Sequence, residues 1–136
     1  MGLVSMADPT PSAPQARKLG LKPGLRLAVI NQPAGWSFAE APVDLELVNE
    51  GPADVILAFF TTMAEVADRY PVLGERIRPA GGLWIAWPRR AAGHRSDIDG
   101  DVLRELILPT GLVDNKNAAI DEDWSGLRFV WRLNQR

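Results

Sequence analysis

Three short, nearly continuous apolar runs recur along the chain. They cover residues 25–30 (Leu-Arg-Leu-Ala-Val-Ile), 53–60 (Ala-Asp-Val-Ile-Leu-Ala-Phe-Phe) and 83–87 (Leu-Trp-Ile-Ala-Trp). Runs of this length and composition are typical of strands that are buried on both faces, as in a parallel sheet covered by helices. We therefore expect three buried strands, with the 53–60 strand central in the sheet.

A helix is predicted between the second and third runs. Thr62 and Glu65 have the spacing of a capping box, which predicts a helix from about Met63. Pro71 should limit or restart this helix near its middle, because proline lacks an N–H donor. The apolar positions that share one stripe of the helix are Val66, Tyr70 and Leu73.

The remaining elements are predicted from weaker patterns. Residues 43–48 alternate apolar and acidic side chains, as in an edge strand with one face in water. Residues 101–108 predict a short helix, capped at Ser96-Asp97.

Residues 115–120 and 127–133 predict an antiparallel hairpin around the polar loop 121–126. Arg128 and Arg132 should face outward and protect the free edge of the sheet against further pairing.

Together these patterns predict a three-layer α/β fold, with a mostly parallel, Rossmann-like sheet and an antiparallel C-terminal hairpin. Residues 1–16 contain three prolines among small polar residues and predict a disordered tail. Residues 17–136 are expected to form a single domain, since a chain of 136 residues suits one core.

Composition narrows the classes of partner and site. With no cysteine, disulfides, thiolate nucleophiles and cysteine-ligated zinc are excluded. A formal net charge of -2 favours neither nucleic acid nor an anionic membrane as a partner. No apolar run approaches the roughly 20 residues that span a bilayer, and a cytoplasmic location is the default expectation.

The candidate ligand site lies where the buried strands end, because ligands of open α/β sheets bind beyond the carboxyl ends of the strands. Gly35 and Trp36 follow the first strand, and Trp87, Arg89 and Arg90 end the third. We predict that these five residues line a crevice. In the alternative interpretation, residues 31–37 are only a tight connection and Trp36 covers the sheet edge.

Other candidates are weighed in the polar loops. His94 is the only histidine and could serve as a base, or could simply lie at the surface. Asp121, Asp123 and Trp124 could hold a cationic or sugar-like ligand at the hairpin tip, or could form a turn with the ring folded onto the core. No catalytic residue and no metal site is assigned, since the carboxylates of residues 97–101 depart from the calcium-loop pattern.

Two resemblances follow from these residues. Residues 21–24 and 77–84, each ahead of a strand, resemble the first and later core strands of S-adenosylmethionine-dependent methyltransferases. That family holds its cofactor with an acid and a Gly-x-Gly-x-Gly loop at the first strand. Here Val29 stands at the acid, and only one of the three glycines is kept. The residues at the three glycine positions are Asn31, Pro33 and Gly35.

The second resemblance covers the chain from about Lys18 to Val130. The sequence is similar to a family of small bacterial proteins designated domain of unknown function 3052. The segments that carry this resemblance are residues 18–24, 83–89, 111–116 and 121–129, of which Trp-Ser-Gly-Leu-Arg-Phe (124–129) is the most specific. This resemblance implies no particular activity.

Three functional hypotheses remain. The first is a non-enzymatic small-ligand-binding or regulatory module on a shortened methyltransferase-like fold, with no cofactor of its own and an unknown small molecule or protein as partner. The second is an enzyme, either a divergent S-adenosylmethionine-dependent methyltransferase or another small enzyme using His94 or the acids of residues 121–123. The third is a self-associating interaction protein, as a homodimer formed through its tryptophans or hairpin.

Overall fold

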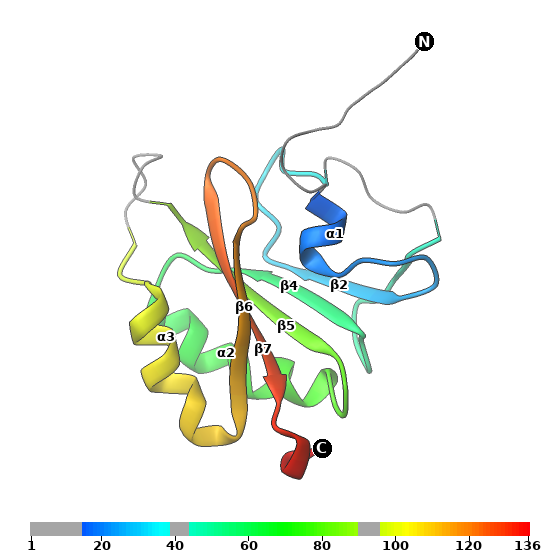
Figure 1. Ribbon diagram of the computed structural model, residues 1–136. Coiled ribbons are helices and arrows are strands. Elements are labelled where there is room, and N and C mark those ends of the chain that lie inside the picture. The colour runs from blue at the N-terminus through cyan, green and yellow to red at the C-terminus, as the bar shows by residue number, and fades with distance from the viewer. Residues whose placement is uncertain (1–14, 39–43, 90–95) are drawn as a thin grey trace.

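The computed structural model of the protein describes residues 15–38, 44–89 and 96–136 (Figure 1). Its strands are β2 (Arg26–Ile30), β3 (Glu46–Leu47), β4 (Val55–Phe59), β5 (Gly82–Pro88), β6 (Leu112–Ala119) and β7 (Trp124–Trp131). Its helices are α1 (Gln15–Leu19), α2 (Met63–Arg76) and α3 (Gly100–Ile107), with 3-10 turns η2 (Leu108–Thr110) and η3 (Leu133–Gln135). The predicted tail, residues 1–16, lies almost wholly outside the described residues.

The strands form one sheet in the order β3-β2-β4-β5-β7-β6. Neighbours among β3, β2, β4 and β5 pair in parallel, while β7 runs antiparallel to both β5 and β6. The prediction of a mostly parallel sheet with an antiparallel C-terminal hairpin is confirmed. The 53–60 run is central as expected, because β4 lies between β2 and β5 and all five of its residues are buried.

The two faces of the sheet are covered differently (Figure 1). Helices α2 and α3 pack on one face, where Val66 and Leu103 join the same buried cluster as Ile85. On the other face, Leu19 of α1 packs with Trp84 of β5, whose indole Nε1 donates to the Leu19 carbonyl at 3.1 Å. The prediction of three layers is not confirmed, because in the described part of the chain this second face carries one five-residue helix.

Helix α2 begins as predicted and is continuous through Pro71. Thr62 and Glu65 form the expected capping box, and Val66 and Leu73 are buried. The helix runs on through Pro71, although that residue was expected to limit or restart it. Pro71 is exposed, and the buried side chains on both sides of it hold the helix on the sheet, which offsets the lost backbone donor.

The start of α3 is capped by a different residue than expected. Asp99 is the N-cap, and its Oδ1 accepts from the Val102 amide at 2.9 Å. Asp97 instead accepts from the Met63 amide at 2.8 Å, and the Ser96 hydroxyl donates to the Thr61 carbonyl at 2.8 Å. The segment before α3 is therefore attached to the start of α2.

The C-terminal hairpin is longer and tighter than predicted. Its strands begin three residues earlier than expected, at Leu112 and Trp124. The turn is tight because Oδ1 of Asp121 accepts from the amides of Asp123 at 2.8 Å and Trp124 at 2.9 Å. These bonds end the turn at residue 123, so the Trp-Ser-Gly segment is strand.

The edge role expected of the arginines is wrong. Arg128 lies on β7, which pairs on both sides, and the free edge of the hairpin belongs to β6. Arg132 lies one residue beyond the end of β7. No helix in the described ranges is long and apolar enough to cross a membrane.

Candidate functional site

The segment after β2 is folded back onto the sheet. Asn31 adopts a left-handed backbone conformation (φ 56°), and its Nδ2 donates to the Phe59 carbonyl at the end of β4 at 3.1 Å. Gly35 also has positive φ (76°), which a residue with a side chain adopts at a cost. The connection is therefore a defined turn held against the end of β4.

Aromatic rings fill the space under this segment. Trp36 makes edge-to-face contacts with Phe38 and Phe59, and Phe59 makes another with Trp124, each with ring centroids 4.9 Å apart. The Trp36 indole donates to Oδ2 of Asp121 at 2.7 Å. Trp36 therefore packs onto the sheet and joins the first-strand segment to the hairpin turn.

A cavity of about 350 Å3, termed here the first-strand pocket, lies beside this aromatic cluster. It is lined by Pro33, Ala34, Gly35, Trp36, Ser37, Asp121, Asp123 and Trp124. The Asp121 carboxylate is already engaged, since it accepts from the Trp36 indole and from two backbone amides. Its geometry is that of a turn residue that positions its neighbours.

Arg89 connects the end of β5 to the same turn. Its amide donates to the Asp123 carbonyl at 2.8 Å, and its guanidinium lies 3.4 Å from the Asp121 carbonyl and 3.3 Å from the Glu122 carbonyl. Its charge therefore lies over backbone oxygens at the rim of a second cavity, and it forms no ion pair with a carboxylate of the described residues.

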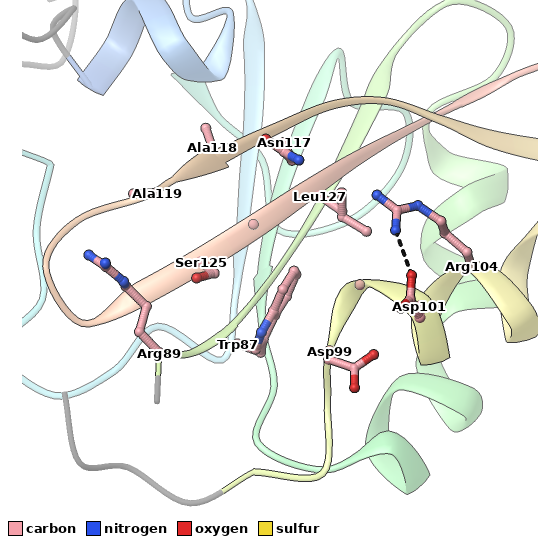
Figure 2. Close-up of a pocket in the computed structure, with 12 residues that line it drawn as sticks. Trp87, Arg89, Asp99, Asp101, Arg104, Asn117, Ala118, Ala119, Ser125 and Leu127 are labelled. Carbon is pink, nitrogen blue, oxygen red and sulfur yellow. Dashed lines mark hydrogen bonds and ion pairs between the residues drawn. The ribbon is translucent and has the colours of Figure 1, made fainter. Parts of the chain in front are cut away.

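That second cavity, termed here the hairpin pocket, has a volume of about 610 Å3 and lies between the hairpin and the first turn of α3 (Figure 2). It is lined by Trp87, Arg89, Asp99, Gly100, Asp101, Arg104, Asn117, Ala118, Ala119, Ser125, Gly126 and Leu127. Figure 2 shows the Trp87 side chain between the hairpin and α3. The pocket lies at the carboxyl end of β5, on the face that α2 and α3 cover elsewhere.

Strand register makes the floor of the hairpin pocket. Trp87 pairs with Ser125, and Ser125 pairs with Ala119. Leu127 pairs with Asn117 in the next row on the same face. Residues directly opposite each other in antiparallel strands share a face. The floor therefore carries one flat aromatic ring, a hydroxyl and a carboxamide among small or apolar side chains.

Charges on α3 make the wall of the hairpin pocket. Asp99 caps the helix, and Asp101 lies 3.1 Å from Nη1 of Arg104. Nε of Arg104 also donates to Asp114 at 2.9 Å, and this hydrogen bond raises the pKa of the guanidinium. Two cations, Arg89 and Arg104, are thus balanced by two carboxylates in the lining.

The structure divides the predicted crevice between these two pockets. Trp87 and Arg89 line the hairpin pocket. Gly35, Trp36 and the hairpin-tip candidates line the first-strand pocket. Arg90 and His94 lie outside the described residues. Among the residues that are described, no group of three or more His, Asp or Glu side chains could hold a metal ion.

Sequence reasoning missed the residues that make the floor and wall of the hairpin pocket. Asn117, Ser125 and Arg104 were not among the candidates, and Asp99 was considered only as a possible metal ligand. The signal for two of them was available, since Asn117 and Ala119 alternate along one strand and Ser125 and Leu127 along the other. Their convergence with α3 depends on pairing that only the structure shows.

Comparisons with known proteins bear on the fold. No protein-family model matches the sequence, and no curated protein matches it either. The likeness to family 3052 therefore stays a prediction.

The solved structures that are similar to this chain include the following three. One is ribosomal protein L11 methylase from Lactobacillus delbrueckii subsp. bulgaricus, with a TM-score of 0.56 and 12% identity over 87% of this chain and 75% of that one. A SAM-dependent methyltransferase from Aquifex aeolicus has a TM-score of 0.52 and 14% identity, covering 83% of this chain and 85% of that one. Precorrin 8w decarboxylase from Methanobacterium thermoautotrophicum has a TM-score of 0.52 and 9% identity, covering 91% and 93%. At these identities the likeness shows a Rossmann-like, methyltransferase-like fold.

Proposed function

We propose that the protein is a non-enzymatic binding module for a polar small molecule, and that the ligand occupies the hairpin pocket. The observation that carries the proposal is the 610 Å3 cavity at the carboxyl end of β5, with Trp87 rising beside polar groups from three elements. Small-molecule sites combine this range of volume with a few convergent polar groups. Ligands of open α/β sheets also bind at this end of the strands.

The lining indicates the class of ligand. The Trp87 ring offers a flat face for a planar group, and Asn117 and Ser125 offer both donors and acceptors. Because the two arginines are balanced by Asp99 and Asp101, the pocket favours a neutral or zwitterionic molecule over a polyanion. A nucleoside-like ligand with a flat base and a hydroxylated sugar has this chemistry.

A binding role is favoured over catalysis by the state of the charged groups. Asp99 is used as a helix cap, and Asp101 and Arg104 are paired with each other. In the described part of the pocket, therefore, each carboxylate already has a structural partner, whereas a general base must be able to reach a substrate proton.

The methyltransferase-like fold implies S-adenosylmethionine, but the first-strand segment does not fit that cofactor. The acid position holds Val29, two of three glycine positions hold Asn31 and Pro33, and no helix occurs in the described residues between β2 and β3. Trp36 lies over Phe59 where that loop would approach a ligand. We therefore derive no methyl-transfer step.

The test compares two tryptophan substitutions on β6. Ala119→Trp places a large ring on the floor of the hairpin pocket beside Ser125, whereas Lys116→Trp places the same ring on the opposite face, since Lys116 pairs with Arg128. Both positions are exposed, so neither change should unfold the protein. Adenosine, S-adenosylmethionine and its demethylated product are titrated by calorimetry into wild type and both variants.

We expect one or more of these probes to bind wild type and Lys116→Trp equally and to bind Ala119→Trp at least tenfold more weakly. Equal affinity in all three proteins would show that the ligand does not bind in the hairpin pocket. Binding of S-adenosylmethionine that survives Ala119→Trp with methyl transfer to any acceptor would instead support the divergent methyltransferase.

A further inference from the structure

A third cavity lies at the opposite end of the strands from the hairpin pocket, and its lining carries an excess of positive charge. Its volume is about 290 Å3, and it lies where the parallel strands begin and β7 ends. Four cationic side chains line it, against the single carboxylate of Asp54. The cationic residues are Lys22, Arg26, Arg78 and Arg128. This cavity, termed here the cationic pocket, shares no lining residue with the hairpin pocket.

Arg128 is the unusual member of the set. It projects from an internal strand and is half-buried. Its guanidinium lies across Gly82 of β5, where an added Cβ would sit 2.6 Å from Cζ. A side chain at position 82 would therefore displace the Arg128 guanidinium from its present position.

The Arg128 guanidinium has no carboxylate partner among the ion pairs of the described residues. Its Nη1 donates to the neutral Oδ1 of Asn115 at 3.3 Å. Burial, and secondarily the charge of Arg136, lowers the pKa of Arg128. A desolvated cation is costly unless an anion compensates it.

Two other arginines are held in place around the cavity by contacts that use only part of each guanidinium. Arg26 pairs with Asp54 at 3.3 Å. Arg78 stacks over the Trp131 ring at 3.7 Å and donates to Glu75 at 2.9 Å. These contacts fix the cations before any ligand arrives, which reduces the ordering cost of binding.

We propose that the cationic pocket binds a phosphate group, either free or as the monoester or diphosphate end of a small molecule, with Arg128 as its central ligand. Guanidinium groups match phosphate oxygens by paired, charge-assisted hydrogen bonds. Lys22, which is exposed on the turn after α1, adds a point charge at the rim. This site is independent of the proposed function and lies at the opposite end of the strands from the hairpin pocket.

The test follows the Arg128 Nε–H signal of the wild type, and the backbone amide signals of Ala80 and Gly81 in the wild type and every variant, by NMR while pyrophosphate or inorganic phosphate is added. Sodium chloride at matched ionic strength is the reference. Arg128→Gln removes the central cation, and Arg132→Gln removes an exposed cation just beyond the same strand as a matched control. We expect a saturable shift with phosphate or pyrophosphate only. We also expect affinity at least tenfold weaker in Arg128→Gln and unchanged in Arg132→Gln.

A second variant keeps the test decisive if Arg128→Gln is poorly folded. Lys22→Gln changes an exposed side chain and should weaken pyrophosphate binding by roughly threefold to tenfold, as expected for loss of one rim charge. The proposal is overturned if chloride at equal ionic strength gives the same shifts, or if Arg132→Gln weakens binding as much as Arg128→Gln does. A saturable response to pyrophosphate but not to inorganic phosphate would identify the diphosphate end as the ligand.

Discussion

Strands β2 and β5 both end at the carboxyl end of the parallel sheet, but their ends are covered differently. The segment after β2 packs closely on the sheet, whereas the larger cavity lies beside the end of β5. After β2, Trp36 packs on Phe59 and Phe38 packs on Trp36, and the cavity beside them is the smaller, first-strand pocket. After β5, the chain is next described from Ser96 and continues into α3, and the described residues leave the floor around Ser125 open as the hairpin pocket. Among the described segments, the one that packs its aromatic rings on the strand ends leaves the smaller cavity.

The difference also separates stability from binding. The aromatic and polar groups of the first-strand segment contact the sheet and Asp121. In the described part of the chain, the hairpin pocket is lined by an aromatic ring and by polar groups from the hairpin and α3. Substitutions in the first region should mainly lower the free energy of unfolding, and those in the second should mainly weaken ligand binding.

The largest expected effect is on Trp36. Trp36→Ala removes two ring contacts and the hydrogen bond to Asp121, and should lower the free energy of unfolding by about 2–4 kcal/mol. Trp87→Ala is the matched change in the hairpin pocket and should cost roughly half as much. Urea denaturation measures both. Equal losses would break the distinction between a packed segment and an open pocket.

The next effect separates two neighbouring carboxylates. Asp121→Ala removes the acceptor for the Trp36 indole and for two amides, and should cost about 1–3 kcal/mol. Asp123→Ala changes an exposed side chain and should stay within about 0.5 kcal/mol of wild type. If the two variants are equally stable in thermal unfolding, the turn does not depend on Asp121.

How much of this could be predicted from the sequence depends on the range of the interactions. Strands β4 and β5 were predictable because burial on both faces leaves a continuous apolar run. Register and strand order were not, because β7 inserts between β5 and β6 and nothing local specifies which hairpin strand docks on the sheet. The same insertion turned Arg128 from an expected edge residue into an interior one, and brought Asn117 and Ser125 together with α3.

The smallest expected effect is on the pH dependence of stability, and it comes from the Arg26–Asp54 pair at the end of the sheet where the parallel strands begin. Hydrogen bonds from Arg26 lower the pKa of Asp54 below its ordinary value. The pair should therefore stabilise the fold at pH values above about 4, where Asp is ionised in the unfolded chain, and this stability should be lost as pH falls further.

Asp54→Asn should lower neutral-pH stability by no more than about 1 kcal/mol, since the Asp54 side chain is 37% exposed, and should flatten the acid side of the stability profile by the same amount. Urea midpoints from pH 2.5 to 7 measure this, with Asp68→Asn, an exposed change on α2, as control. An unchanged acid limb in Asp54→Asn would assign the acid sensitivity to other carboxylates.

We expect a ligand to bind in the hairpin pocket and not in the first-strand pocket. The five tryptophans give five indole N–H signals in an NMR spectrum, and Trp87→Phe and Trp36→Phe assign the two that matter. Adenosine or S-adenosylmethionine is added to the wild-type protein until the spectrum stops changing. We expect the Trp87 signal to move and the Trp36 signal to stay in place. Movement of Trp36 with Trp87 unchanged, or no movement of either with any probe, would contradict it.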